Sequence, residues 1–179
     1  MEPAHRYYPP DNALLLEKYE GKNGGTCGPS SIAALERKPV QEILNGWLGK
    51  GEESFKGYAP IGDMLETLKI LGYTVKKKRG LKANTFPYPE TPTAIVRIQW
   101  LQNDGQPFFW REAGRHTHYV AMCKEPDVIG TGWWVFCNSV SWFRAHDRWG
   151  EEYLQGTGVD HNRYGPPGYV SSYLELTKV

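Results

Sequence analysis

The spacing of apolar residues changes near Thr93, and this change limits the folds that the chain can adopt. In residues 40–47 and 61–71 the apolar side chains recur at the period of an amphipathic helix. From Thr93 to Gln99 the side chains alternate and many are β-branched, which is typical of a strand. Helices followed by strands predict an α+β fold, with a helical layer first and an antiparallel sheet second.

Turn and cap residues predict further boundaries. A first helix is expected to begin at Thr26 or Cys27 and to end before Pro39, and Gly72 is expected to stop the helix over 61–71. Strands are predicted at residues 73–78, 93–99, 118–123, 133–137 and 168–179. Long loops are expected at 79–92, 101–115 and 143–168, where residues 156–168 form either a flap or an ordered connector.

Length, charge and cysteine content exclude several classes of protein. The 179 residues suit a single domain over 1–179, and a net charge of +1 gives no reason to expect nucleic acid or an acidic membrane surface as a partner. No stretch approaches the roughly 20 apolar residues of a membrane-spanning helix, and no secretory signal is recognised. Three cysteines without CxxC spacing indicate a reducing compartment, so a cytoplasmic location is expected. The oligomeric state is left open.

The run NGGTCGPSSIAAL places Cys27 after a glycine turn and at the start of a predicted helix. The free N–H groups and partial positive charge of a helix start favour the thiolate, which is the nucleophilic form of cysteine. A thiolate nucleophile also needs a base and a group that orients the base. His118 is the preferred base, with His116 on the same strand face as its competitor. Asn138 is the preferred orienting group, and Asp127 and Asp147 are the alternatives.

These residues resemble the papain-like cysteine peptidases, in which the chain order is Cys, His and Asn. The CGPSSIAAL segment is most similar to the bacterial branch that trims double-glycine leader peptides of bacteriocins, and HYVAM and NSVSW resemble the His and Asn strands. The resemblance runs from about Asn23 to Tyr153, with three short specific segments. It implies a helical lobe carrying Cys27 against a sheet carrying His118 and Asn138, a peptide or protein substrate, and no cofactor or metal.

The chain departs from the family pattern in one respect. Papain-like enzymes usually carry a Gln shortly before the Cys as a donor to the oxyanion, and no Gln precedes Cys27. Asn23 is the only nearby side-chain amide that could replace it, together with the backbone N–H of Cys27. The loss of one such donor typically costs about 10²–10³ in rate. Trp142 is expected either to cover the His–Asn pair from water, as the resemblance implies, or to fill the core.

The predicted function is therefore that of a cysteine peptidase or amidase, which cleaves a peptide, isopeptide or amide bond through Cys27, His118 and Asn138. Transamidation remains open, because an amine can replace water in the second step. The alternative is a catalytically weak or inactive papain-like module that binds or inhibits another protein. The missing Gln and the aromatic loop residues Phe108, Phe109 and Trp110 favour this alternative.

Three other patterns are given structural explanations. Cys123 and Cys137 lie in apolar strands and are expected to pack in the core. The basic run from Lys76 to Arg79 is interpreted as a solvated strand edge that blocks further pairing, in preference to a nucleic-acid patch. The cysteine and histidine spacings match no standard zinc site.

Overall fold

A six-stranded antiparallel sheet forms the centre of the computed structural model, which describes residues 25–79, 88–102, 106, 109, 117–124, 132–138, 141–144 and 168–179. The strand order across the sheet is β1-β6-β2-β3-β4-β5. All neighbouring strands pair antiparallel. The strands are β1 (Tyr73–Arg79), β2 (Thr93–Trp100), β3 (Thr117–Lys124), β4 (Trp133–Cys137), β5 (Ser141–Arg144) and β6 (Gly168–Lys178).

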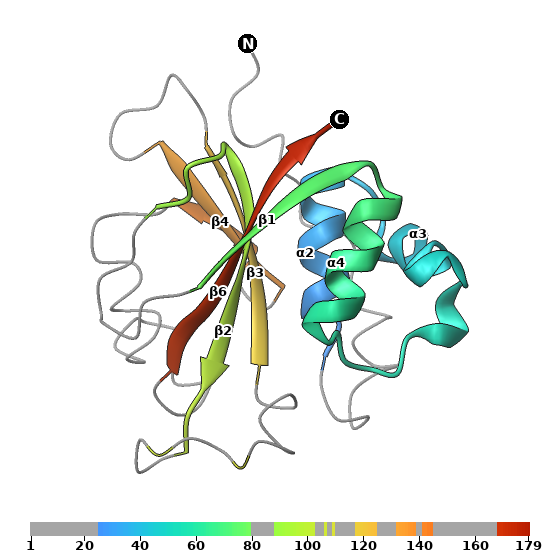
Figure 1. Cartoon of the computed structure of the whole chain (residues 1–179), viewed down its shortest axis with the longest axis horizontal. Helices are drawn as coiled ribbons and strands as arrows, with labels where there is room; N and C mark the ends of the chain where they lie inside the picture. Colours follow the sequence, from blue (N-terminus) through green and yellow to red (C-terminus); the bar gives the residue numbers. More distant parts are fainter. Residues whose placement is uncertain are drawn as a thin grey trace.

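Within the described segments, three α-helices precede the sheet in the chain and lie together on one side of it (Figure 1). They are α2 (Cys27–Glu36), α3 (Val40–Asn45) and α4 (Ile61–Ile70), with short 3₁₀ turns at Trp47–Gly49 and Glu52–Ser54. Pro39 precedes the first turn of α3, and Gly72 follows α4 with a φ of +84°, which favours glycine. The predicted α+β order, helices first and antiparallel sheet second, is confirmed.

The structure differs from the sequence prediction at two strands. β5 was not predicted, because its four residues follow β4 after a connection of three residues and show too little alternation to be recognised. The C-terminal strand β6 lies between β1 and β2, with Leu174 and Leu176 buried in the core. β1 is an edge strand, as the basic run predicts. Residues 156–167 of the segment predicted to be a flap or an ordered connector lie outside the described residues.

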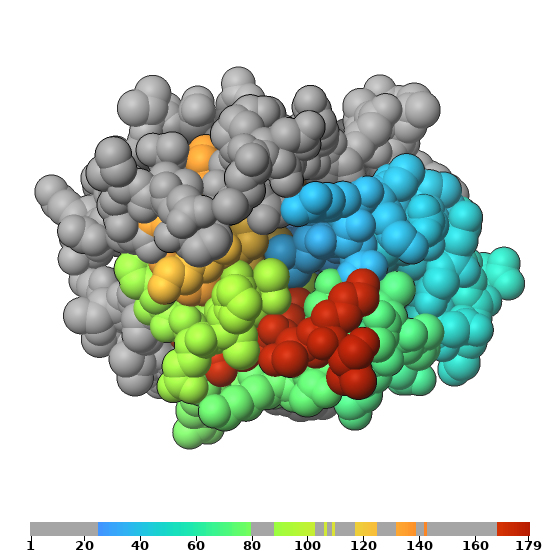
Figure 2. Space-filling view, turned by 90° about the horizontal axis from the view of Figure 1, so that it is seen from above, coloured from blue at the N-terminus to red at the C-terminus, as the bar shows by residue number. Residues whose placement is uncertain are grey.

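The C-terminal end of β6 is joined to the helical layer by a polar contact. Glu36, at the end of α2, accepts a hydrogen bond from Tyr73 and pairs with Lys178 at 2.6 Å. Figure 2 shows this end of the molecule, where β6 in red lies beside blue and green segments from the first half of the chain. The contact therefore ties the last strand to the first described helix, 142 residues away in the sequence.

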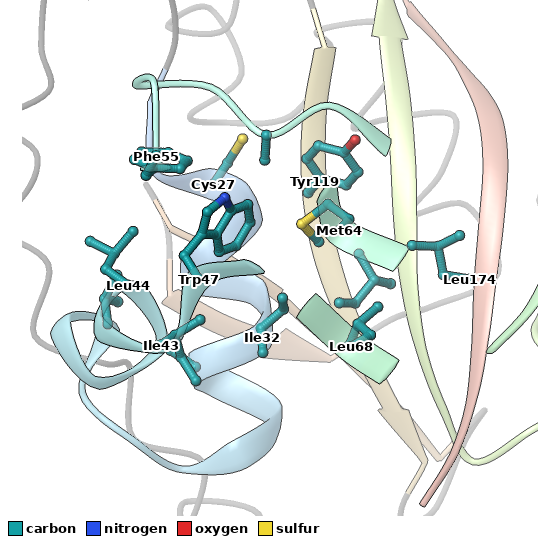
Figure 3. Close-up of a cluster of buried hydrophobic side chains, with 14 of the residues drawn as sticks. Cys27, Ile32, Ile43, Leu44, Trp47, Phe55, Met64, Leu68, Tyr119 and Leu174 are labelled. Carbon is teal, nitrogen blue, oxygen red and sulfur yellow. The ribbon is translucent and has the colours of Figure 1, made fainter. Parts of the chain in front are cut away.

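Two apolar clusters fill the opposite faces of the sheet. The cluster beneath the helices contains Ile32, Trp47, Met64 and Leu174, and Cys27 belongs to it. Figure 3 shows Cys27 in this cluster, with Phe55 and Trp47 to one side and Tyr119 to the other. The cluster on the other face is formed by side chains of β2, β3, β4 and β6. No helix in the described part of the chain is long and apolar enough to cross a membrane.

Candidate active site

Cys27 is the first residue of α2, where the helix backbone begins close to the sheet. Thr26 occupies the N-cap position but its side chain makes no capping hydrogen bond, so the first N–H groups of the helix are left to other partners. A Cβ atom built on Gly28 would lie 2.5 Å from Cβ of Ala59 and 2.9 Å from Sδ of Met64. Only glycine therefore allows this close approach. The Cys27 side chain itself is 8% exposed.

His118 lies near the start of β3, the strand against which α2 packs. It pairs with Ile98 of β2 in the sheet register, and its ring stacks on Trp100 with centroids 6.3 Å apart. The side chain is 8% exposed. Sheet pairing and ring stacking together hold the imidazole in a narrow range of orientations, which suits a group that must transfer a proton.

The Cys27 thiol and the His118 imidazole interact with each other. Burial lowers the pKa of His118, but charge attraction and hydrogen bonding from Cys137 and Cys27 outweigh it and raise the pKa to about 10. His118 is therefore an imidazolium at neutral pH, with both ring nitrogens carrying hydrogen. Cys137 is the first of the two thiol partners that raise this pKa and Cys27 the second. Cys27 is therefore one of the two thiols that influence the titration of His118, and the roles of nucleophile and base stay predictions.

Cys137 is the unexpected member of this group. It is fully buried, as its apolar strand predicts, but its Sγ lies 3.3 Å from Nε2 of His118. Ala121 of β3 pairs with Phe136 of β4, so these two side chains lie on the same face of the sheet. Because side chains alternate along a strand, His118, three residues before Ala121, and Cys137, one residue after Phe136, both lie on the opposite face. The sequence prediction missed the contact because this register was unknown. The only sequence signal was that Cys137 immediately precedes Asn138.

The other predicted site residues are placed differently. Asn138 directly follows β4 and is half-buried, but no hydrogen bond joins its side chain to His118, and its buried Oδ1 has no partner within the described segments. Trp142 packs on Phe136 at a ring-centroid distance of 5.3 Å. Asn23 and His116 lie outside the described residues, as do Asp127 and Asp147. The orienting role of Asn138 and the oxyanion role of Asn23 stay predictions.

The site has the groups of thiol chemistry rather than those of metal binding. Nowhere in the described ranges do three or more His, Cys, Asp or Glu side chains gather in a way that could hold a metal ion. All three cysteines are free thiols. Comparison with known proteins gives no family: no family model and no curated protein matches the sequence. The interpretation of the site therefore depends on its own geometry.

Proposed function

We propose that the chain is a cysteine-type hydrolase of peptide, isopeptide or amide bonds, with Cys27 as nucleophile and His118 as acid and base. The observation that carries this proposal is that Cys27, a thiol at a helix start, is among the groups that raise the pKa of His118 to about 10. Thiolate and imidazolium form the resting pair of such enzymes, and the helix start supplies N–H groups at the reacting sulfur.

The reaction follows from the positions of these groups. The Cys27 thiolate attacks the substrate carbonyl carbon, so that a C–S bond forms and the negative charge moves to the oxygen. The backbone N–H of Cys27 and the Asn23 side chain are the proposed donors for that oxygen. His118 then gives its proton to the leaving amine as the C–N bond breaks. Neutral His118 next removes a proton from water, which cleaves the thioester and restores both residues.

A non-catalytic module is the second candidate. Cys27 is only 8% exposed, so a substrate carbonyl must enter a nearly closed space to reach its sulfur. The Sγ atom of Cys137 also lies 3.3 Å from Nε2 of His118, the ring nitrogen that an orienting carboxamide is expected to contact. Both observations favour a protein that has kept the frame of a thiol hydrolase and binds a partner without cleaving it.

Thiol labelling separates the two candidates without knowledge of the substrate. Iodoacetamide at about pH 6 reacts with thiolates and hardly with ordinary thiols. We expect Cys27 to be alkylated at least about tenfold faster than Cys123 and Cys137, with the sites identified by peptide mass spectrometry. His118→Ala should remove this advantage, whereas Lys69→Ala, on the exposed face of α4, should not. Equal labelling of Cys27 in the parent and in His118→Ala would refute the hydrolase proposal.

A further inference from the structure

A basic pocket opens on the helical side of the sheet, close to the start of α4. Its volume is about 410 Å³, and its lining residues come from α4, β1, β2 and β6: Ile61, Lys77, Arg79, Arg97, Ser171 and Ser172. Among these described lining residues, Lys77, Arg79 and Arg97 are cations and none is an acid. A concave surface of one charge concentrates ions of the opposite charge, so the pocket has the electrostatics of an anion site.

The cations of this pocket differ from their neighbours on the same strand. Lys76 and Lys78 form ion pairs with Glu90, and Lys78 also pairs with Glu175. Lys77 and Arg79 form no ion pair with any residue that the structure describes. The basic run of β1 therefore contains two kinds of residue. Lys76 and Lys78 form ion pairs at the strand edge, whereas Lys77 and Arg79 line the pocket and have no ion pair within the described segments.

Two buried polar atoms in the pocket wall also lack partners. Arg97 donates from Nη1 to Ser171 Oγ at 3.0 Å, while its Nε is buried and makes no hydrogen bond to the described segments. Ser172 is 3% exposed, and its Oγ is likewise buried without a hydrogen bond there. Leaving such groups unsatisfied costs about 1–3 kcal/mol each. An anion in the pocket would balance the charge of Lys77 and Arg79, which have no ion pair within the described segments.

The pocket lies beside the thiol site. Arg97 of β2 pairs directly with Tyr119 of β3, and its guanidinium opposes the rise that burial causes in the pKa of Tyr119. The ring of Tyr119 in turn packs over Gly28, where a Cβ atom would lie 3.6 Å from Cδ2. Ala59 touches the same glycine and is two residues from Ile61 of the pocket wall. The Tyr119 side chain therefore lies between Arg97 of the basic pocket and Gly28, the residue after Cys27.

We propose that this pocket is a specificity subsite, which binds an anionic side chain of the peptide substrate, either a carboxylate or a phosphate. This inference rests on the proposed hydrolase function, because it treats the bound anion as part of the molecule that reaches Cys27. Arginine is suited to both anions through its planar array of donors. A substrate anchored here would present a nearby backbone amide to the Cys27 sulfur.

The first test measures binding without catalysis. The Cys27→Ala chain is titrated with N-acetylglutamate amide, N-acetylglutamine amide and inorganic phosphate, and binding is followed by amide and guanidinium NMR shifts. We expect the glutamate probe or phosphate to shift the Arg97 signals and the glutamine probe to leave them unchanged. Lys77→Gln combined with Arg79→Gln should weaken binding about tenfold, while Lys76→Gln, on the paired edge, should not. Equal responses to the two amino-acid probes would overturn the proposal.

The second test measures cleavage and separates the two proposals. Peptide pools that differ only in Glu, phosphoserine or Gln at one position are digested by the parent and by the Lys77→Gln, Arg79→Gln variant. We expect the parent to prefer an acidic pool and the variant to lose this preference through a higher KM, with kcat retained. Cleavage by the parent with no preference overturns the subsite alone. If Cys27→Ala binds anions but the parent shows no thiol-dependent cleavage of any pool, the hydrolase proposal is overturned. The pocket then remains an anion-binding site.

Discussion

Two thiols flank the same imidazole, and their surroundings differ in almost every other respect. Cys27 begins α2 and belongs to the cluster beneath the helices, whereas Cys137 ends β4 and belongs to the cluster on the opposite face of the sheet. Cys27 is 8% exposed and Cys137 is fully buried. Interaction with His118 therefore does not by itself indicate which cysteine would be the nucleophile of the proposed hydrolase.

The distinguishing factor is the backbone around each sulfur. Cys27 is the first residue of α2, where the first N–H groups have no partner within the helix, so they could stabilise a thiolate and later an oxyanion. At Cys137 the backbone pairs with Ser141 in the ladder between β4 and β5. In a strand ladder the backbone N–H groups bond to the neighbouring strand and do not converge as they do at a helix start. The two positions thus suggest a reacting thiol and a supporting thiol.

The largest expected effect is the loss of activity when the reacting thiol or its base is removed. Cys27→Ala and His118→Ala should each lower the rate of peptide cleavage by on the order of 10⁴–10⁶-fold, because both belong to one catalytic unit. The double variant should be no slower than either single variant. Each rate should be compared with the Tm of the same variant. Inactivity accompanied by a lost thermal transition would indicate that Cys27 supports the fold instead.

A smaller effect is expected from the supporting thiol. Cys137→Ala should lower the free energy of unfolding by about 1–2 kcal/mol, because it opens a cavity in a packed strand. It should lower the cleavage rate only about tenfold, because it releases Nε2 of His118 while leaving the Cys27 sulfur in place. Urea unfolding and steady-state rates measure the two quantities.

Asn138→Ala is the matched variant for this comparison, since it alters the next residue along the chain. If Cys137 holds the imidazole, Asn138→Ala should slow cleavage less than Cys137→Ala does. A slower Asn138→Ala enzyme would instead identify Asn138 as the orienting residue and Cys137 as a packing residue. Cys137→Ser, which keeps a hydrogen-bonding atom at this position, should recover part of the rate.

A further expected effect concerns the pH dependence of stability. The pKa of His118 is about 10 in the folded protein, compared with the ordinary value of 6.5 expected in the unfolded chain. The folded state therefore binds the proton more tightly. The resulting stabilisation is complete below pH 6.5 and is lost as pH rises through 10. The difference in unfolding free energy between the parent and His118→Gln should therefore shrink over this range, as measured by urea titration. A difference that grows with pH would show that His118 is neutral when folded.

The same variants would show which sulfur carries the charge. The pKa of His118, followed by its ring-proton NMR signal, should fall in both Cys27→Ala and Cys137→Ala, because each removes one attractive partner. A larger fall in Cys27→Ala would place the thiolate at the helix start. A larger fall in Cys137→Ala would place it in the strand and would reverse the roles inferred for the two thiols.

The helices and most strands could be predicted because their signals are local. The helical spacing over 61–71 and the alternation over 93–99 depend only on neighbouring residues, and α4 and β2 form there. β5 was missed because four residues are too few to establish a period. The division of the basic run was missed as well, since the partners of Lys78 are 12 and 97 residues distant in the sequence, at Glu90 and Glu175.

The sequence by itself determined that a helix begins at Cys27 and that His118 lies in a strand. Tertiary structure alone decided which groups meet: β6 lies between β1 and β2, and Cys137, not Asn138, approaches Nε2 of His118. The reason is that hydrophobic period specifies the face on which a side chain lies but not the strand beside it or the register between them. A catalytic site assembled from several strands depends on that register.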